Sequence, residues 1–232
     1  MNLVSIIDHA VLHPTATVDD LQRECQLAHK LGVASVCVKP YMVLQASELL
    51  ADSPVAVGTV IGFPHGGNTT SVKVLEAQHA CDDGAVELDM VINIGKALEG
   101  EWDYIALDIK SVLDVANEND ALLKVIFETD YITDPTSITK LCEICTQLQV
   151  AFVKTSTGFG YTKQPSGDYN YAGAREADVQ RMRNACGPQI GVKASGGIRS
   201  ADDAGRMVEL GATRLGTSAS QAIADGDQGS SY

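Results

Sequence analysis

The sequence predicts a single-domain (β/α)8 barrel, also called a TIM barrel, over residues 1–232. Short β-rich runs alternate with helical patterns along the whole chain, and such alternation indicates parallel strands joined by helical crossovers. Polar side chains recur near the carboxyl ends of several runs, and a closed barrel collects such side chains at one mouth. An open doubly wound sheet is the alternative. It is disfavoured because no strand precedes a dinucleotide-binding glycine pattern; Gly62-Phe-Pro-His-Gly66 has the wrong spacing and a proline in the turn.

Eight strands are expected, each a short run of apolar and β-branched residues. They are residues 6–12, 35–39, 55–61, 86–92, 122–129, 151–156, 189–195 and 213–216. At least six helices lie between them, at residues 18–31, 69–83, 102–119, 134–148, 175–186 and 200–210. Thr17 or Asp19 is expected to cap the first helix, and Gly32 to end it. The longest irregular stretch, residues 158–173, follows a strand and is therefore expected at the active-site face as a lid.

The charge balance excludes whole classes of partner. The chain carries 17 Lys and Arg against 30 Asp and Glu, a formal net charge of −13, while 45% of its residues are hydrophobic. A surface this acidic repels nucleic acid and anionic membranes at long range, so we expect neither as a partner. A small phosphorylated ligand remains possible, because backbone N–H groups and a few placed cations can bind it locally.

The cysteines and the first residues predict a cytoplasmic protein. The six cysteines are scattered through a chain long enough to fold without disulfides, so we expect reduced thiols. Residues 1–7 contain no basic region and are followed by Asp8, unlike a signal peptide, and no apolar run is long enough to span a bilayer. Cys142-x-x-Cys145 falls in a helical pattern with no second pair, which favours burial over a metal or redox site.

Two lysines lie inside expected strands. Period-two alternation places Lys154 on one face of its strand with Ser156, and Lys193 on one face of another with Ser195. If the strands are adjacent and in register, two ammonium groups about 5 Å apart repel by roughly 3 kcal/mol at an effective dielectric constant near 20. Repulsion and burial together lower a lysine pKa, and a neutral lysine attacks carbonyls to form a Schiff base. The alternative for either lysine alone is a structural pairing with a carboxylate.

Further residues are expected to surround the lysines. Asp89, in Glu87-Leu-Asp89, points to the same side as the lysines; it could move protons through a water or serve only as an ion-pair partner of Lys124 or a site lysine. Lys124 and Glu128 share a face of their strand and are expected to complete the charge network. Cys37 faces inward, as a small residue lining the wall rather than as a nucleophile.

Glycines directly after three strands predict a phosphate site. Barrels commonly bind phosphate in the loops after strands seven and eight, where glycine lets backbone N–H groups approach the anion. The expected contacts are Thr157-Gly158, Gly196-Gly197 and Gly216-Thr-Ser218. Each pair alone is a common turn, and their joint placement favours a phosphorylated substrate.

Six motifs together resemble those of the deoxyribose-phosphate aldolases, class I enzymes that act without a metal or other cofactor. They run in the family's order over nearly the whole chain: Ile7-Asp-His-Ala-Val-Leu, Val36-Cys-Val-Lys-Pro, Gly62-Phe-Pro-His-Gly, Glu87-Leu-Asp-Met-Val-Ile-Asn93, Val153-Lys-Thr-Ser-Thr-Gly-Phe and Val192-Lys-Ala-Ser-Gly-Gly-Ile-Arg. The resemblance implies reversible cleavage of 2-deoxy-D-ribose 5-phosphate to glyceraldehyde 3-phosphate and acetaldehyde, in deoxyribonucleotide catabolism.

The resemblance also implies roles for individual residues. Lys154 would be the Schiff-base nucleophile, Lys193 would tune its pKa, and Asp89 would relay protons with Lys193 and a water. Arg199 joins the glycines and Ser218 as a phosphate contact. Tyr232, at the end of a tail over residues 219–232 that reaches the active-site mouth, would take part in proton exchange at the enamine carbon.

Two departures and two rival functions remain open at this point. The last glycine loop reads Gly216-Thr-Ser218-Ala219, where relatives often carry a further serine, and residues 160–171 are longer than in compact members of the family. A class I aldolase for another phosphosugar would keep Lys154 and differ around Cys37 and residues 158–173. A non-catalytic phosphosugar-binding barrel would have no need of two in-strand lysines. A homodimer is compatible with the sequence, which does not determine the oligomeric state.

Overall fold

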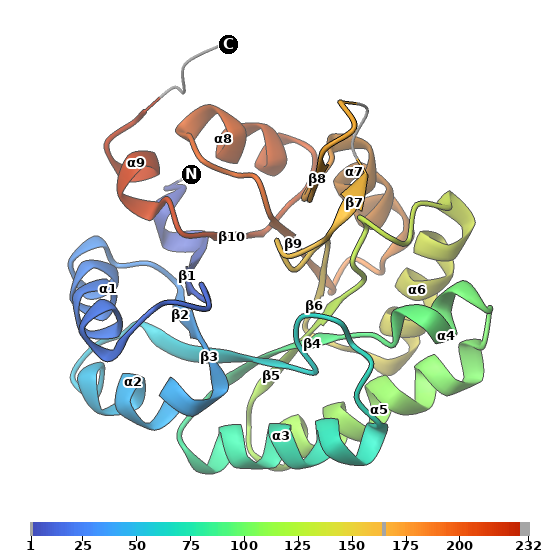
Figure 1. Cartoon of the computed structure of the whole chain (residues 1–232), viewed down its shortest axis with the longest axis horizontal. Helices are drawn as coiled ribbons and strands as arrows, with labels where there is room; N and C mark the ends of the chain where they lie inside the picture. Colours follow the sequence, from blue (N-terminus) through green and yellow to red (C-terminus); the bar gives the residue numbers. More distant parts are fainter. Residues whose placement is uncertain (1, 164–165, 228–232) are drawn as a thin grey trace.

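Eight parallel strands close into a barrel, which confirms the predicted fold (Figure 1). The computed structural model describes residues 2–163 and 166–227. Around the barrel each strand pairs with the next along the chain, and the last pairs with the first. The strands are β1 (Ile7–Val11), β2 (Ser35–Val38), β3 (Ala56–Ile61), β4 (Glu87–Val91), β5 (Leu122–Ile126), β6 (Phe152–Lys154), β9 (Gly191–Ser195) and β10 (Arg214–Thr217).

A ring of helices covers the outside of the barrel (Figure 1). The six predicted helices are present as α1 (Val18–Leu31), α3 (Thr70–Asp82), α5 (Trp102–Glu118), α6 (Pro135–Leu148), α7 (Glu176–Ala185) and α8 (Ala201–Glu209). Three short helices were not predicted, because five to seven residues are too few to show a helical period: α2 (Val43–Leu49), α4 (Ile94–Leu98) and α9 (Ser220–Ala224). Two 3₁₀ turns add to them, η1 (Val4–Ile6) and η2 (Pro40–Met42).

The ends of α1 follow from its sequence. The Thr17 hydroxyl accepts a hydrogen bond from the backbone N–H of Asp20, and the Asp20 carboxylate accepts one from the backbone N–H of Thr17. This reciprocal pair satisfies two N–H groups that the first turn leaves without a partner. At the other end Gly32 adopts a φ of +67°, the left-handed conformation that glycine takes without steric cost. Of the two caps predicted from the sequence, Thr17 and Asp19, the structure has Thr17.

The apolar core lies between the barrel and the helices. Leu88 and Met90 alternate with Glu87 and Asp89 along β4, and all four are buried. Outward-facing apolar side chains of the strands pack against helices such as α5, whose buried face includes Ile105 and Ile109. In the part of the chain that the structure describes, no helix combines the length and apolar character needed to cross a bilayer.

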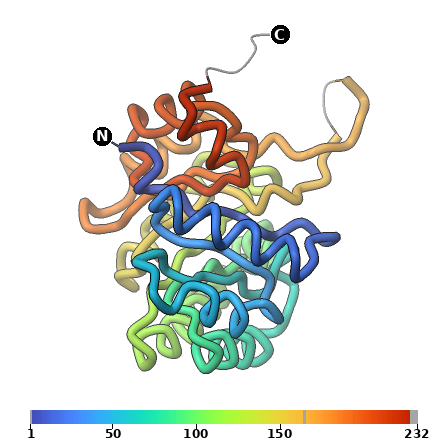
Figure 2. Tube along the Cα trace, turned by 90° about the vertical axis from the view of Figure 1, so that its left-hand side faces the viewer, coloured from blue at the N-terminus to red at the C-terminus, as the bar shows by residue number. Residues whose placement is uncertain are grey.

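The stretch from residue 158 to 173 is not wholly irregular, as the sequence had suggested. It contains a small antiparallel pair, β7 (Thr162–Lys163) with β8 (Tyr169–Asn170). The rings of Tyr161 and Tyr169 stack with their centroids 4.8 Å apart. Figure 2 shows the described residues around β7 and β8, in light orange, extending away from the body of the barrel.

Candidate active site

The two in-strand lysines are direct neighbours in the barrel. β6 pairs with β9 in parallel, and in that register Lys154 lies opposite Lys193, as the sequence had predicted for adjacent strands. Both side chains point inward and are buried, Lys154 at 3% and Lys193 at 1% relative exposure. Burial removes the water that would otherwise stabilise an ammonium group, so both depend on protein groups for compensation.

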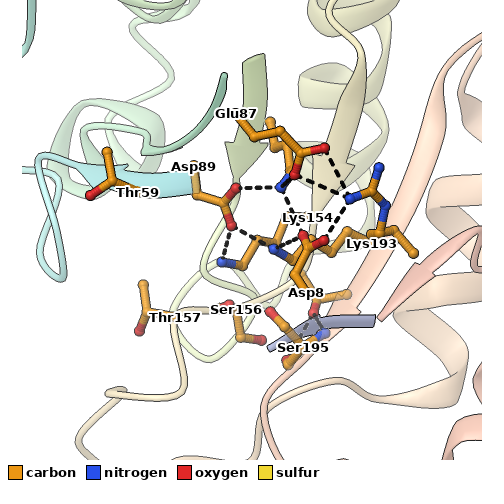
Figure 3. A network of polar contacts seen from close by, with 12 residues as sticks. Asp8, Thr59, Glu87, Asp89, Lys154, Ser156, Thr157, Lys193 and Ser195 are labelled. Carbon is orange, nitrogen blue, oxygen red and sulfur yellow. Dashed lines mark hydrogen bonds and ion pairs between the residues drawn. The ribbon is translucent and has the colours of Figure 1, made fainter. Parts of the chain in front are cut away.

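Asp89 bridges the two lysines through a single oxygen. Its Oδ2 atom lies 2.6 Å from Lys154 Nζ and 2.7 Å from Lys193 Nζ, and the carboxylate is fully buried (Figure 3). A third lysine, Lys124 on the neighbouring strand β5, approaches the other oxygen, Oδ1, at 3.0 Å. Asp89 therefore forms ion pairs with Lys124, Lys154 and Lys193. The sequence analysis had named these lysines as its possible partners.

The network extends to residues that the sequence analysis did not assign to the site. Asp8 on β1 accepts hydrogen bonds from Lys193 and Lys124, the latter at 2.7 Å, and its Oδ1 lies 2.5 Å from Arg214 Nη1 on β10. Glu87 binds Lys124 at 2.5 Å and Arg214 at 3.1 Å. An acid inside the first apolar strand was the available signal for Asp8, the same signal that identified Asp89.

The buried network carries an excess of positive charge. Four cations, Lys124, Lys154, Lys193 and Arg214, meet the three carboxylates Asp8, Glu87 and Asp89, so full ionisation leaves a net charge of +1. Removing one proton from a lysine would make the cluster neutral, and the lysine with the weakest carboxylate support loses it most easily. That lysine is Lys154, which pairs with one carboxylate where Lys124 pairs with three.

The pKa shifts of the lysines follow the same order. Burial lowers the pKa of Lys154; Asp89 opposes this, and the neighbouring Lys193 ammonium adds to the lowering. Burial also acts to lower the pKa of Lys193, but the carboxylates of Asp8 and Asp89 outweigh burial, so the pKa of Lys193 is raised. Asp8, Asp89 and Glu87 likewise overcome burial at Lys124 and hold its pKa well above the usual value. Lys154 is thus the lysine of the three best suited to act as a neutral amine.

A cavity of about 550 Å³ opens above the lysine pair at the mouth of the barrel. Lys154 and Lys193 both line it, whereas Asp89 is fully buried and is not among its lining residues. The predicted binding residues also line it: Cys37, Thr157, Gly158, Gly196, Gly197, Arg199, Gly216 and Ser218. An amine of lowered pKa at the floor of a cavity can add to a carbonyl compound that enters it.

Comparison with known proteins agrees with this chemistry. The family model described as DeoC/LacD family aldolase matches residues 3–230. The chain belongs to this family. It is 46% identical over 228 residues to a deoxyribose-phosphate aldolase of Thermococcus gammatolerans, covering 97% of this chain and 96% of that protein. A deoxyribose-phosphate aldolase of Enterococcus faecalis is also 46% identical, over 232 residues that make up 100% of both chains.

Solved structures show the same relationship in three dimensions. The deoxyribose phosphate aldolase of Aeropyrum pernix, described as a unique tetrameric structure, superposes with a TM-score of 0.85 at 32% identity, covering 96% of this chain and 89% of that one. The present chain is therefore an aldolase, a carbon–carbon lyase built on a TIM barrel, as the motifs implied.

The glycine-rich rim of this aldolase is held in a tight arrangement. Gly158, Gly196 and Gly197 all have positive φ, at +80°, +88° and +80°. The backbone N–H of Ala174 donates to the carbonyl of Gly196 at 3.0 Å, and a Cβ on Gly173 would lie 2.5 Å from that carbonyl oxygen. The end of the 158–173 stretch is thus pressed against the Gly196–Gly197 turn.

Three further residues predicted to contribute to the site are Gly216, Arg199 and Tyr232. Gly216 has no positive φ; its importance is steric, because a Cβ there would meet Lys193 Cε at 3.0 Å and Ser195 Cβ at 2.8 Å. Arg199 is exposed and its guanidinium lies 3.4 Å from the Tyr171 hydroxyl, which also borders the cavity. Tyr232, the predicted proton-exchange residue, lies outside the described residues.

Glu128 lies beyond the end of the strand β5, on which it was expected to share a face with Lys124. β5 ends at Ile126, and Glu128 has a φ of +53°, so the extended alternation of the strand does not continue through this residue. Its carboxylate accepts hydrogen bonds from the Thr157 hydroxyl and from the Thr157 backbone N–H, the latter at 3.2 Å. Glu128 therefore holds the chain just after Lys154. Burial raises the pKa of Glu128, and the Lys154 ammonium acts against this rise.

Cys37 lies in the wall of the cavity, as predicted. Its side chain is buried, and burial together with the nearby Asp89 carboxylate raises the pKa of the thiol to about 11. Only the thiolate is a good nucleophile, so a lining role fits this residue better than a reactive one. Cys142 and Cys145 are buried on α6, and all six cysteines are free thiols.

Proposed function

We propose that this aldolase reversibly cleaves 2-deoxy-D-ribose 5-phosphate to D-glyceraldehyde 3-phosphate and acetaldehyde through a Schiff base on Lys154. The observation that carries the proposal is the Lys154–Asp89–Lys193 bridge at the floor of the cavity, since it places an amine of lowered pKa beside an amine of raised pKa. The names of the curated relatives point to the same substrate.

In the proposed reaction, the Lys154 amine adds to the C1 aldehyde of the open-chain sugar, and loss of water gives an iminium. The iminium accepts the electron pair of the C2–C3 bond as that bond breaks. The 3-hydroxyl loses its proton, and the C3 carbon leaves as the aldehyde of glyceraldehyde 3-phosphate. The remaining enamine is protonated at C2, and hydrolysis then frees acetaldehyde and restores the amine. The imine supplies the electrophilic activation, so the mechanism calls for no metal or other cofactor.

Lys193, Asp89 and a water would carry the protons. Burial acts to raise the pKa of Asp89, yet Lys124, Lys154 and Lys193 outweigh it and hold this pKa well below the usual value. Asp89 would therefore stay anionic and orient Lys193 and the water, while Lys193 exchanges the proton. Tyr232, on the segment 219–232 that we propose to reach the mouth, is the candidate for protonating the enamine carbon.

The phosphate would bind at the rim. Gly158, Gly196 and Gly197 offer backbone approaches, and Arg199 and Ser218 offer side-chain donors, all lining the same cavity. The net charge of −13 does not prevent such binding. A local phosphate site needs only backbone N–H groups and a few of the 17 Lys and Arg side chains.

Borohydride reduction in the presence of acetaldehyde tests the covalent step. An ethyl group added to the Lys154 peptide supports the aldolase mechanism, and unmodified protein that still binds the phosphosugar would instead indicate a non-catalytic binding barrel. Turnover of 2-deoxyribose 5-phosphate compared with unphosphorylated deoxyribose tests the substrate. Trapping on Lys154 without turnover of either sugar would indicate a class I aldolase for another phosphosugar.

We propose a cytoplasmic homodimer as the working form. Six free cysteines fit a reducing compartment. Support for self-association comes from outward-facing apolar side chains on packed helices, Val72 and Leu75 of α3 and Leu107 of α5, each at least 44% exposed. The related Aeropyrum protein is described as a tetramer. Light scattering of the purified protein distinguishes monomer, dimer and tetramer.

A further inference from the structure

His9 links the barrel to two helices through both of its ring nitrogens. It lies on β1 directly after Asp8, and its side chain points to the opposite side of the strand, toward the helices. Nδ1 is 2.7 Å from the hydroxyl of Ser220, the first residue of α9, and Nε2 is 2.9 Å from the Glu24 carboxylate on α1. His9 and Ser220 are fully buried, and Glu24 borders the active-site cavity.

The partners determine how these bonds are oriented. A carboxylate can only accept, so Nε2 carries the proton and donates to Glu24. Nδ1 is then the acceptor, and the Ser220 hydroxyl donates to it. Burial lowers the pKa of His9, although Glu24 opposes this. The ring is therefore neutral near pH 7, with each nitrogen making one hydrogen bond.

The same three residue types occur in serine hydrolases, but access excludes that chemistry here. The Ser220 side chain is sealed from solvent and does not border the cavity, so no ester or peptide can reach its hydroxyl. The arrangement holds segments of the chain in place instead.

The segment held by His9 forms one side of the cavity rim. Gly216, in β10, lines the cavity together with Ser218 and Ala219, which lie between β10 and α9. At the β10 end, the Thr217 hydroxyl donates to the Ile198 carbonyl at 2.7 Å and accepts from the Ala219 backbone N–H at 2.9 Å. At the α9 end, Ser220 is tied to His9.

We propose that His9 is a positioning residue for phosphate binding, which fixes Ser218 and its neighbours by anchoring Ser220. The inference rests on the proposed function, since it assumes that Ser218 contacts the phosphate. It places His9 outside the covalent chemistry, because its ring lies on the far side of β1 from Lys154 and Asp89. Loss of the anchor should therefore weaken binding of the phosphorylated substrate and leave the Lys154 chemistry intact.

The Ser220→Ala variant removes the donor with the smallest change of shape. We expect KM for 2-deoxyribose 5-phosphate to rise about tenfold, the effect of losing one buried hydrogen bond. Turnover of unphosphorylated deoxyribose and ethyl trapping on Lys154 should stay within about twofold of the unmodified protein. A matched control is Ser53→Ala, because Ser53 makes the same contact to His29 Nδ1, at 2.8 Å, on residues that do not line the cavity.

His9 variants provide a second measurement if Ser220→Ala fails to fold. His9→Asn retains an acceptor near the position of Nδ1 and should keep a KM close to that of the unmodified protein, whereas His9→Gln, which reaches toward Glu24 instead, should show the raised KM. Equal losses on both sugars, or an unchanged KM in folded Ser220→Ala and His9→Gln, would overturn the proposal. If the unmodified protein shows no preference for the phosphorylated sugar, the proposed phosphate site itself is wrong.

Discussion

Lys154 and Lys193 face each other across adjacent strands and share one oxygen of Asp89, at 2.6 and 2.7 Å. The two neighbours of the Lys154 amine act on its pKa in opposite directions: the Lys193 ammonium lowers it and the Asp89 carboxylate raises it. Removing Lys193 and removing Asp89 should therefore shift the pKa of Lys154 in opposite directions.

Lys193→Met should shift the pH dependence of Schiff-base trapping on Lys154 to higher pH, since a repelling charge is lost and Asp89 is left to pair with Lys154. Asp89→Asn should shift it to lower pH, because the stabilising carboxylate is lost, even though proton transfer and turnover suffer. The rate of borohydride trapping with acetaldehyde, measured from pH 5 to 10, gives both shifts to within roughly half a pH unit. Lys110→Met, in an exposed ion pair, is the control. Shifts of the same sign would contradict the assignment.

Asp8 should be a major contributor to stability. Asp8→Asn leaves Lys124, Lys193 and Arg214 without one of their buried carboxylates, and removal of one partner from a buried ion pair costs about 3–5 kcal/mol. Urea denaturation at pH 7 measures the loss. Asp114→Asn, in an exposed pair with Lys110, should cost no more than about 1 kcal/mol. Equal effects of the two variants would show that the buried network does not stabilise the fold.

Acid should destabilise the protein through the same residue. Although burial acts to raise the pKa of Asp8, the surrounding cations hold it below its usual value. The unfolded chain, where Asp titrates near about 3.9, therefore binds a proton first as the pH falls. The stabilisation is complete above that pH and is lost as the pH drops toward the lower native value. Denaturation midpoints from pH 6 to 2 should fall below about pH 4, and less steeply in Asp8→Asn; identical slopes would argue against this origin.

Gly173→Ala should damage the rim of the cavity. Gly173 has a φ of +74°, and an added Cβ would press on the Gly196 carbonyl, displacing the turn that we propose for phosphate binding. We expect KM for the phosphorylated sugar to rise by about tenfold or more, from steric and backbone strain of a few kcal/mol. Gly167→Ala is a matched control in the same stretch, with a φ of +93° and open space around the Cβ. A larger effect in the control would refute the steric argument.

Cys37 should resist alkylation in the folded protein. Its pKa of about 11 leaves little thiolate at pH 8, and the side chain is buried. Mass spectrometry after iodoacetamide treatment should show labelling of the half-buried Cys81 well before Cys37. Because Asp89 contributes to the raised pKa, Asp89→Asn should accelerate labelling of Cys37; no acceleration would contradict that cause.

The barrel, the lysine pair and the cavity-lining glycines could all be predicted because each depends on local period or on position after a strand. Asp8 and Arg214 could not be placed in the same way. They meet only where the first and last strands pair, and alternation within a strand does not reveal which distant strands supply opposite charges.

The backbone conformation of Glu128 and the β7–β8 pair could not be predicted, for a different reason. A positive φ at a glutamate, and a two-residue antiparallel pair, are imposed by tertiary contacts against local preference. The hydrogen bonds from Thr157 to Glu128 are one such contact, and nothing in the spacing of residues 122–129 indicates them.

The odd charge of the buried network has a consequence for the covalent intermediate. With Lys154 protonated, the cluster carries one excess positive charge; with the free amine it carries none; and with an iminium on Lys154 the charge returns to +1. The carboxylates that accommodate the resting ammonium are therefore already oriented to stabilise the iminium. Dipoles and charges fixed before the reaction need not reorganise during it. The barrel interior thus acts as a preorganised solvent for the cation that bond cleavage requires.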